Sequence, residues 1–568
     1  MQAIVRRSIL AGVIAALSLV VWAESGAAPP PAPLAARREA VSVRLPSAAF
    51  AAMETINPEH IRWHVRFLSH DLLEGRGTGQ RGGIAAEYMA TQFAEYGLKP
   101  AGDNASYLQK VPLVGITTLA ETQFSLLPKH GAAMNLKPLD DYVAYDQTQQ
   151  AQSDVDAEIV YVGYGIEAPE YNWDDYKGMD VRGKVLLMLV NEPPSDDPKF
   201  FKGKALTYYG RWTYKYEEAA RKGAVGVILI HREDMASYPW EVVRNSNSGE
   251  KSYLKLEGPA LKVASWVQLD VAKKLTAASG MDLDKMMADA RTREFRPMNL
   301  GAKLKAHMVS KVRNFESNNV LAMLPGSNRY RKDEAVVFTA HYDHLGIRPD
   351  MPGDNIYNGA ADNATGCGIL LELARSFSVA KDRPGRSIIF AAVTAEEQGL
   401  LGSEYLGKHP PIPAGKIALD LNYDDVQPIG APEEVEVSGA ERTTFYPWVQ
   451  ATAKEFRLAI RPDARPEAGH FYRSDHFSLA RVGIPSFSIN EGMKFKGHDE
   501  AWGLAQDKEY TEKRYRQPSD EYHPEMDFVG DAAVARFGFA LAWEAASLSR
   551  LIGWQKGDEF EAARAKSQ

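Results

Sequence analysis

An imidazole and several carboxylates stand directly behind apolar runs in the last third of the chain. His341 ends one run and Asp343 follows it closely, while the adjacent pair Glu396 and Glu397 ends the next run. Asp424 follows a third run. Carboxylates are costly to bury unpaired, whereas imidazole and carboxylate oxygens together suit a catalytic zinc or manganese ion. The pattern therefore predicts a metal site.

A glycine-containing loop supplies a further carboxylate between the first two runs. Residues 358–366 read NGAADNATG, and the glycines permit a tight turn that can direct Asp362 inward. The same residue types favour the N-cap of a helix, which here would begin near Cys367. From this loop alone, both interpretations of Asp362 stay open.

The single cysteine limits the chemistry further. With only Cys367 in the chain, no intramolecular disulfide and no thiolate metal cluster can form. The apolar helical sequence around this residue favours a buried packing role over a nucleophilic one. Any metal must therefore be held by histidines and carboxylates.

Alternating apolar runs and amphipathic segments predict the elements that position these side chains. Buried strands followed by helices are typical of a mainly parallel α/β sheet, and open sheets of this kind place their sites at the carboxyl ends of the strands. We expect strands at 334–340, 386–394, 416–424 and 484–489, and helices at 366–377, 443–456 and 531–554.

Two regions nearer the N-terminus have different sequence patterns. From Pro58 to Tyr96 apolar residues recur at helical spacing, and Gly97 predicts the end of that region. From about residue 135 to 295, short β runs alternate with glycine turns, which indicates an insert able to fold independently. Its aromatic cluster is interpreted as domain-interface packing, with the lining of a cleft entrance as the alternative. The cluster consists of Tyr208, Tyr209, Trp212, Tyr214 and Tyr216.

The N-terminus indicates export. Arg6 and Arg7 precede an apolar run over 9–23, followed by small residues and prolines. This run is shorter than the roughly 20 residues that a membrane-spanning helix needs. A cleavable signal peptide is therefore favoured over an anchor, and we expect a periplasmic or extracellular protein without stable membrane insertion.

Charge and composition argue against a nucleic-acid partner. The 568-residue chain has a formal net charge of -8 and no run rich in lysine or arginine. Its hydrophobic content of 45% is ordinary for a globular protein with a sizeable core.

The motifs, in their order along the chain, resemble those of the co-catalytic zinc aminopeptidase family. This family includes bacterial secreted aminopeptidases, glutamate carboxypeptidase and the transferrin receptor. The matching segments are AHYDHLG from residue 340, NGAADNATG from 358, TAEEQGLLGSEYL from 394 and NYDD from 422. Residues 163–189 and 216–231 resemble the protease-associated insert that many members carry.

The resemblance implies roles for these residues. Glu396 would be the general base that deprotonates a water held by the metal, and Asp343 would support His341. Asp424 is preferred over Asp420 because it matches the Asn-x-Asp of the family. The implied metal ligands are His341, Asp362, Glu397 and Asp424, with Asp362 bridging two zinc ions.

One expected ligand is missing. The family has Tyr-His in a Tyr-His-x-Pro-x-Asp stretch, whereas residues 515–520 read YRQPSD. Arginine has no lone pair to donate to a metal, so the second metal is in question. We expect Arg516 to lie beside the second metal position and to pair with Glu397. Three histidines remain as candidates for the missing ligand: His476, His498 and His523.

The overall prediction is an α/β fold with a mixed, mainly parallel sheet flanked by helices, phosphorylase/peptidase-like, carrying a β-rich α/β protease-associated insert. The expected divisions are a signal peptide (1–27), a linker (28–50), a first catalytic segment (51–135), the insert (136–295), the main catalytic segment (296–556) and a tail (557–568).

The expected activity is that of a zinc aminopeptidase acting on peptides. Two other classes stay open: a catalytically silent, receptor-like binding protein of the same fold, and a zinc-dependent glutaminyl cyclase. The replacement by Arg516 favours the silent protein, and the intact pair of Glu396 and Glu397 argues against it.

Overall fold

A computed structural model describes residues 43–79, 81–236, 238–349 and 351–568. The predicted signal peptide and most of the predicted linker lie outside these residues. The last part of the linker segment already belongs to helix α1 (Ser47–Met53).

Four parallel strands form the part of the sheet that carries the predicted site residues. They are β14 (Ala335–His341), β17 (Ser387–Val393), β18 (Ile417–Asn422) and β21 (Ser486–Ser488), in the order β21-β18-β14-β17. Almost every residue of these strands is buried. The expected α/β fold with a mixed sheet is confirmed, and the part that carries the site residues is parallel as expected.

Helices cover both faces of this part of the sheet. Val336 and Phe338 of β14 pack into a large core, whereas Val337 points to the opposite face. The large core is completed by α1, α2 (Pro58–Leu68), α3 (Gly82–Glu95), α9 (Gly366–Ser378) and α14 (Val529–Ser547). The opposite face is covered by α10 (Leu401–Lys408) and α12 (His476–Arg481).

The C-terminus differs from its prediction. The last long helix, expected over 531–554, ends at Ser547, because Leu548 adopts extended backbone angles (φ -57°, ψ 143°). The segment expected as a tail contains α15 (Glu561–Ser567), in which Arg564 is buried and donates to the carbonyl oxygens of Ala414 and Ile552. These buried hydrogen bonds hold the segment on the fold.

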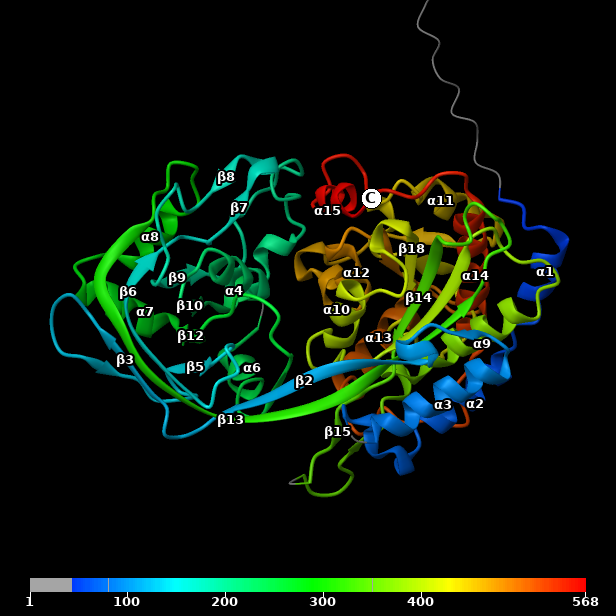
Figure 1. The fold of residues 1–568 in the computed structure, drawn as a ribbon, viewed down its shortest axis with the longest axis horizontal. Coiled ribbons are helices and arrows are strands. Elements are labelled where there is room, and N and C mark those ends of the chain that lie inside the picture. Colours follow the sequence, from blue (N-terminus) through cyan, green and yellow to red (C-terminus); the bar gives the residue numbers. More distant parts are fainter. Residues whose placement is uncertain (1–42, 80, 237, 350) are drawn as a thin grey trace, which may run out of the picture. The chain divides into compact units, whose positions relative to one another are not determined.

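One long strand connects two hydrophobic cores. β13 (Met298–Leu324) has 27 residues; its first part pairs with β6 (Gln152–Tyr161) and its last part with β17. Between these it pairs with β2 (Leu108–Thr118). Figure 1 shows β13 as one long curved strand that runs from the group of strands around β6 and β9 to the group around β14 and β18. The result is a single sheet of 15 strands.

The other end of this sheet forms its own α/β layer. β6, β9 (Val185–Leu189), β10 (Gly226–His231) and β12 (Val263–Gln268) are parallel, and β5 (Tyr142–Tyr145) pairs antiparallel at the edge. Two clusters of buried residues fill its faces. One of these clusters contains residues between Phe124 and Met308, beyond both predicted boundaries of the insert. The boundaries predicted for the insert, 136 and 295, stay a prediction.

The aromatic cluster of this region divides into two environments. Tyr208 packs against Phe477 and Tyr472, with ring centroids 5.1 and 6.5 Å apart, as expected for interface packing. Tyr214 and Tyr216 are buried in the cores of the region itself. In both environments these tyrosines have a packing role.

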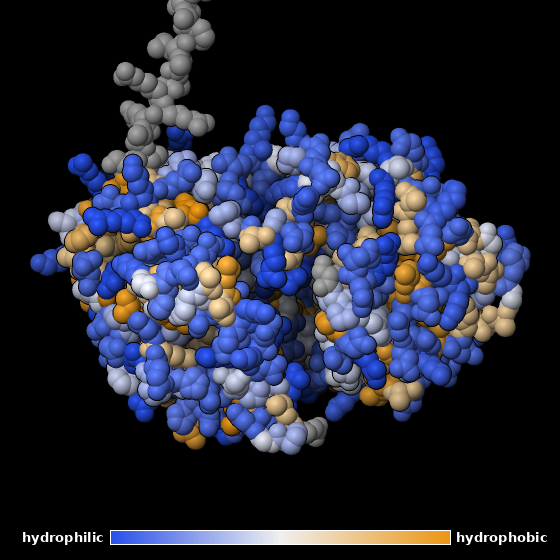
Figure 2. All heavy atoms as spheres, turned by 180° about the vertical axis from the view of Figure 1, so that it is seen from behind, coloured by the Kyte–Doolittle hydropathy of each residue, from blue (hydrophilic) through white to orange (hydrophobic). Residues whose placement is uncertain are grey.

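Figure 2 shows a face that is largely hydrophilic, with hydrophobic residues scattered over it. Among the described residues, no helix combines the length and the apolar character needed to cross a bilayer.

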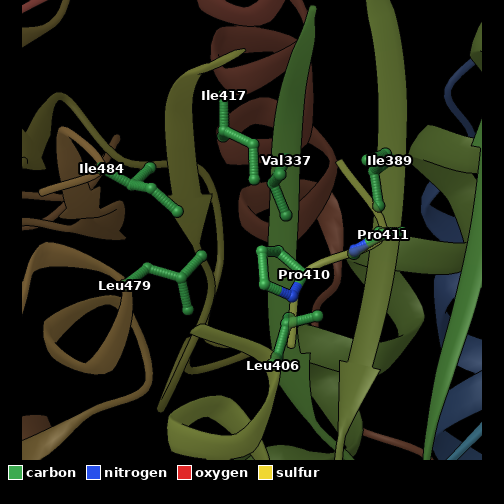
Figure 3. Close-up of a pocket in the computed structure, with 8 residues that line it drawn as sticks. All are labelled: Val337, Ile389, Leu406, Pro410, Pro411, Ile417, Leu479 and Ile484. Atoms are coloured by element: carbon green, nitrogen blue, oxygen red, sulfur yellow. The ribbon is translucent and has the colours of Figure 1, made fainter. Parts of the chain in front are cut away.

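A small apolar pocket lies on the α10 and α12 side of the sheet (Figure 3). Its volume of about 10 Å³ is close to the least that one water needs, and its lining has no polar side chain. It is lined by Val337, Ile389, Leu406, Pro410, Pro411, Ile417, Leu479 and Ile484. This pocket is a packing defect and not a substrate site.

Candidate metal centre

The carboxyl ends of the parallel strands bring the predicted site residues together. His341 is the last residue of β14, Glu396 and Glu397 follow β17, and Asp424 follows β18. Asp362 joins them from the glycine-containing loop before α9. The common edge arises because neighbouring parallel strands end on the same side of the sheet.

The first cluster is built around one ring nitrogen of His341. Its Nε2 lies 3.0 Å from Oδ1 of Asp424 and 3.2 Å from Oδ1 of Asp362. The side chain of His341 is 1% exposed and that of Asp362 is 3% exposed. The other ring nitrogen, Nδ1, lies 3.1 Å from the carbonyl oxygen of Asp343, which can accept its proton. Nε2 is thus left free to ligate a metal.

A second cluster lies beside the first and shares Asp362 with it. Nδ1 of His344 is 2.8 Å from Oε1 of Glu397 and 3.9 Å from Oδ2 of Asp362. The ligand atoms of each of the two groups lie within 4.8 Å of one another. The structure therefore places two potential metal positions side by side.

His344 was missed by the sequence analysis. It follows His341 within the motif AHYDHLG, so a signal was present in the second histidine of that motif. The prediction overlooked it because the expected family pattern assigns the second histidine of the site to the C-terminal stretch. The backbone N–H of His344 donates to the carbonyl oxygen of Arg76, which fixes the turn that carries it.

The loop that presents Asp362 is held by an aspartate at the end of the C-terminal stretch. Asp520 accepts hydrogen bonds from the backbone N–H groups of Ala361 and Asp362 at 3.0 and 3.1 Å. Gly359 opens the loop with φ +59°, a conformation that favours glycine. Asp362 does not cap α9, whose N-cap residue is Thr365. The N-cap interpretation of Asp362 is therefore wrong, and its carboxylate faces the two histidines.

The carboxylate of Asp343 contacts Glu396 and not His341, which it was predicted to support. Its Oδ1 lies 3.9 Å from Nδ1 of His341, too far for a hydrogen bond, and instead accepts from the backbone N–H of Glu396 at 3.1 Å. Support for His341 comes from the backbone carbonyl of Asp343. The carboxylate thus positions the turn that carries Glu396.

Asp424, and not Asp420, belongs to the cluster. Asp424 accepts from the hydroxyl of Ser474, and its backbone carbonyl accepts from Asn490. Asp420 is completely buried and accepts from Thr339 at 3.0 Å. The preference for Asp424 agrees with this geometry.

The environment of Glu396 suits a proton acceptor. Oε2 of Glu396 lies 3.9 Å from Nε2 of His341, and the residue is 6% exposed. Burial raises the pKa of Glu396 well above its usual range in the metal-free protein, although the positive charge of His341 acts in the opposite direction. A cation bound nearby would lower that pKa and favour the carboxylate form.

Arg516 lies at the second cluster, as expected from its place in the motif. Its Nη2 is 2.7 Å from Oε2 of Glu397, and its Nε is 4.0 Å from Oδ2 of Asp362. Its side chain is 44% exposed. The expected ion pair between Arg516 and Glu397 is present.

None of the three histidines proposed as replacements joins a cluster of potential metal ligands among the described residues. His476 is buried against Phe471, with ring centroids 4.8 Å apart. His498 stacks on Trp502 at 3.9 Å. The histidine that lies beside Asp362 and Glu397 in the second cluster is His344.

Comparison with known proteins identifies the region that carries this centre. Residues 319–533 match the model of peptidase family M28. These residues form an M28 peptidase domain. The match confirms the family resemblance drawn from the motifs and contains every residue of the two clusters.

Individual relatives match over shorter stretches of their own length. A probable zinc metalloprotease of Pyrenophora tritici-repentis is 42% identical over 114 residues, which are 19% of this chain and 22% of the relative. Leupeptin-inactivating enzyme 1 of Streptomyces exfoliatus is 28% identical over 214 residues, or 37% and 46% of the two chains. The chain thus matches less than half the length of these curated relatives.

Two solved structures are similar over most of the chain. The aminopeptidase from Aneurinibacillus sp. strain AM-1 is 19% identical, covers 89% of this chain and 97% of its own, and has a TM-score of 0.47. A zinc aminopeptidase from Bacillus subtilis is 17% identical with the same coverage and a TM-score of 0.40.

The residues of the M28 domain fit zinc. Buried atoms with free lone pairs face one another without hydrogen-bond partners, namely Nδ1 of His344 and Oε1 of Glu397. Carboxylates outnumber positive side chains around them, so a cation is needed to balance the buried charge. Imidazole and carboxylate ligands without thiolate are those of catalytic zinc sites. His341, Asp362 and Asp424 would hold one ion.

A buried arginine supports the loops of this centre from behind. Arg76 is completely buried and donates to the carbonyl oxygens of Tyr342, Leu68, Asn358 and Gly359. It thereby ties the segment after β14 to the loop that carries Asp362.

Replacing Arg76 by methionine is expected to lower the free energy of unfolding by about 3 kcal/mol or more, because several buried carbonyl oxygens lose their donor. Urea denaturation of Arg76→Met measures this loss. Arg296→Met, at an exposed position, is the control. A loss for Arg76→Met no larger than that of the control would contradict the supporting role.

Proposed function

We propose that the protein is a zinc-dependent exopeptidase that removes N-terminal residues from peptides. The single observation that carries the proposal is the buried Glu396 beside His341 and its carboxylate partners in an M28 domain. The names of the curated relatives, zinc metalloproteases among them, support a peptidase. The proposal for the whole protein rests on the site geometry, the family match and the names of these relatives together.

Each residue of the site has a task in this reaction. Zinc, when bound, supplies Lewis acidity to the substrate carbonyl and to the attacking water. Glu396 accepts the proton of that water and returns it to the departing amine. Asp343 holds the backbone of Glu396 in place, and the guanidinium of Arg516 can donate a hydrogen bond to the oxyanion that forms during attack.

The charge around the site favours the N-terminal end of a peptide. The carboxylates of Asp362, Glu396, Glu397 and Asp424 gather there, and within the described part of the chain Arg516 is the one arginine paired to them. With one zinc ion bound, the four carboxylates still exceed the positive charges by one, and this excess favours the α-ammonium group of a substrate over its carboxylate end. Aminopeptidase action is therefore proposed over carboxypeptidase action.

The proposal is tested with one peptide in three forms: free at both ends, N-acetylated and C-amidated. We expect zinc-loaded protein to release the N-terminal residue from the free and C-amidated forms and to leave the N-acetylated form intact. Release of the C-terminal residue from the free and N-acetylated forms, with the C-amidated form left intact, would indicate carboxypeptidase action. Cyclisation of an N-terminal glutamine, or binding without turnover by zinc-loaded protein, would favour the cyclase or the receptor-like protein.

We also propose that the region around β6, β9, β10 and β12 is a protease-associated insert within the catalytic chain. Its sequence resemblance over 163–189 and 216–231 supports this assignment. The packing of Tyr208 on Phe477 places an aromatic contact between this region and α12. Such contacts allow the insert to hold its position beside the M28 domain.

We further propose that the protein is exported. The support is the apolar run over 9–23 behind Arg6 and Arg7. N-terminal sequencing of the protein from the medium or periplasm is expected to start between about Glu24 and Pro29, where small residues favour signal peptidase. An intact Met1 in the membrane fraction would contradict export by cleavage.

A further inference from the structure

The second metal position lacks the histidine that the family pattern supplies, because Arg516 occupies its place in the motif. A guanidinium carries no free lone pair at neutral pH. If a second ion binds, another residue must complete its ligands. The geometry of His344 and Glu397 decides which residue that is.

His344 is positioned as a ligand. Its side chain is 0% exposed, and its Nδ1 lies 2.8 Å from Oε1 of Glu397, whose side chain is also 0% exposed. Although the two atoms are close, neither has a hydrogen-bond partner of acceptable geometry. Two lone-pair atoms that face one another in this way are typical of ligands arranged around a cation.

The two carboxylates divide their oxygens between different partners. Oε1 of Glu397 faces His344, while Oε2 faces Arg516 at 2.7 Å. Oδ1 of Asp362 faces His341 at 3.2 Å, while Oδ2 faces His344 at 3.9 Å. For an ion beside His344, Oε1 of Glu397 is therefore free of Arg516, whereas Oδ2 of Asp362 also lies 4.0 Å from Nε of Arg516.

We propose that His344, Asp362 and Glu397 hold the second zinc ion, and that Arg516 lowers the affinity of this position without occupying it. The proposal rests on the proposed function, in that zinc is the expected metal. His344 replaces the histidine that the motif lacks, and it comes from the turn after β14 and not from the C-terminal stretch.

The two positions then differ in affinity. The first is formed by His341, Asp362 and Asp424, and among the described residues no lysine or arginine pairs with Asp424. At the second position, Glu397 also forms an ion pair with Arg516, whose positive charge is fixed. Because like charges repel strongly where water is excluded, the second ion binds at least ~10-fold more weakly, a ratio that corresponds to 1.4 kcal/mol.

The test is zinc titration of metal-free protein by calorimetry, with bound metal counted by elemental analysis after dialysis. Wild type is expected to bind two ions in a tight and a weak step. His344→Gln is expected to lose the weak step and keep the tight one. Arg516→Gln is expected to strengthen the weak step at least ~10-fold, since it removes the repelling charge. With Co²⁺ as the probe, His344→Gln should lose the visible absorption that the second ion adds in wild type and keep that of the first ion.

His476→Gln is the matched control, because His476 is also a buried histidine without hydrogen-bond partners and lies outside both clusters. It is expected to bind two ions as wild type does. Thermal melting shows that each variant is folded. If His344→Gln does not fold, Arg516→Gln alone tests the proposal, because that side chain is 44% exposed and its loss is tolerated by the fold.

Three results would overturn the proposal. They are two unchanged steps in His344→Gln, loss of the weak step in His476→Gln, and an unchanged or weaker second step in Arg516→Gln. Peptide hydrolysis is assayed separately on the same samples. If wild type binds two ions as described and hydrolyses no peptide, the proposed function fails while the metal assignment stands.

Discussion

Replacing Glu396 by glutamine is expected to lower kcat ~10²–10⁴-fold, the usual contribution of a general base, with metal binding unchanged. The carboxylate of Glu396 lies 3.9 Å from Nε2 of His341 and belongs to neither of the two clusters of potential ligands. Glutamine has nearly the same shape but cannot accept the proton of the attacking water. Steady-state kinetics on a peptide with a free N-terminus measures the effect, and elemental analysis measures the metal.

The control for this substitution is Glu404→Gln on α10, where the carboxylate pairs with Lys408 at 2.7 Å. It removes one negative charge from the same domain outside the site, and its kcat should stay near that of wild type. A kcat within about tenfold of wild type for Glu396→Gln would reassign the proton transfer. Loss of metal in that variant would instead make Glu396 a ligand.

Replacing Asp362 by alanine is expected to remove both metal ions and to abolish activity. This carboxylate is the one shared member of the two clusters, with Oδ1 toward His341 and Oδ2 toward His344. The loss of metal affinity should exceed the ~10–100-fold that is typical when a residue behind a ligand is changed. Zinc titration and the bound metal after dialysis measure it.

Asp333→Ala, at an exposed position, is the control for loss of an aspartate. It should keep both ions and full activity. The melting temperature of Asp362→Ala without metal should stay close to that of metal-free wild type, because the substitution removes one of several crowded carboxylates. If Asp362→Ala keeps one ion at wild-type affinity, the carboxylate does not bridge the two positions.

Much of the catalytic fold could be predicted from the chain itself. The apolar runs before His341, Glu396 and Asp424 are long, β-rich and bounded by polar residues, and each became a buried parallel strand. Their alternation with helices determined the sheet type. The end of the last helix was placed too late, because the apolar pattern continues past Ser547 into extended chain.

The continuity of the sheet could not be predicted. β13 is 27 residues long and alternates between exposed and buried positions over its first half only. Which strands pair with it depends on contacts between residues far apart in the chain, such as Met323 with Ile389 and Ala306 with Val155. Local periodicity shows that a segment is a strand and carries no information about its partner.

For this protein the sequence by itself determined the chemistry available: histidine and carboxylate ligands behind apolar strands, no thiolate, and an arginine where a histidine was expected. Tertiary structure alone decided which of these groups meet. His344 approaches Glu397 only because the turn after β14 is held against Arg76, and Asp362 faces both histidines because Asp520 holds its backbone from the far end of the chain. Spacing along a chain fixes side-chain positions within one element, whereas a site assembled from several loops depends on the packing that brings those loops together.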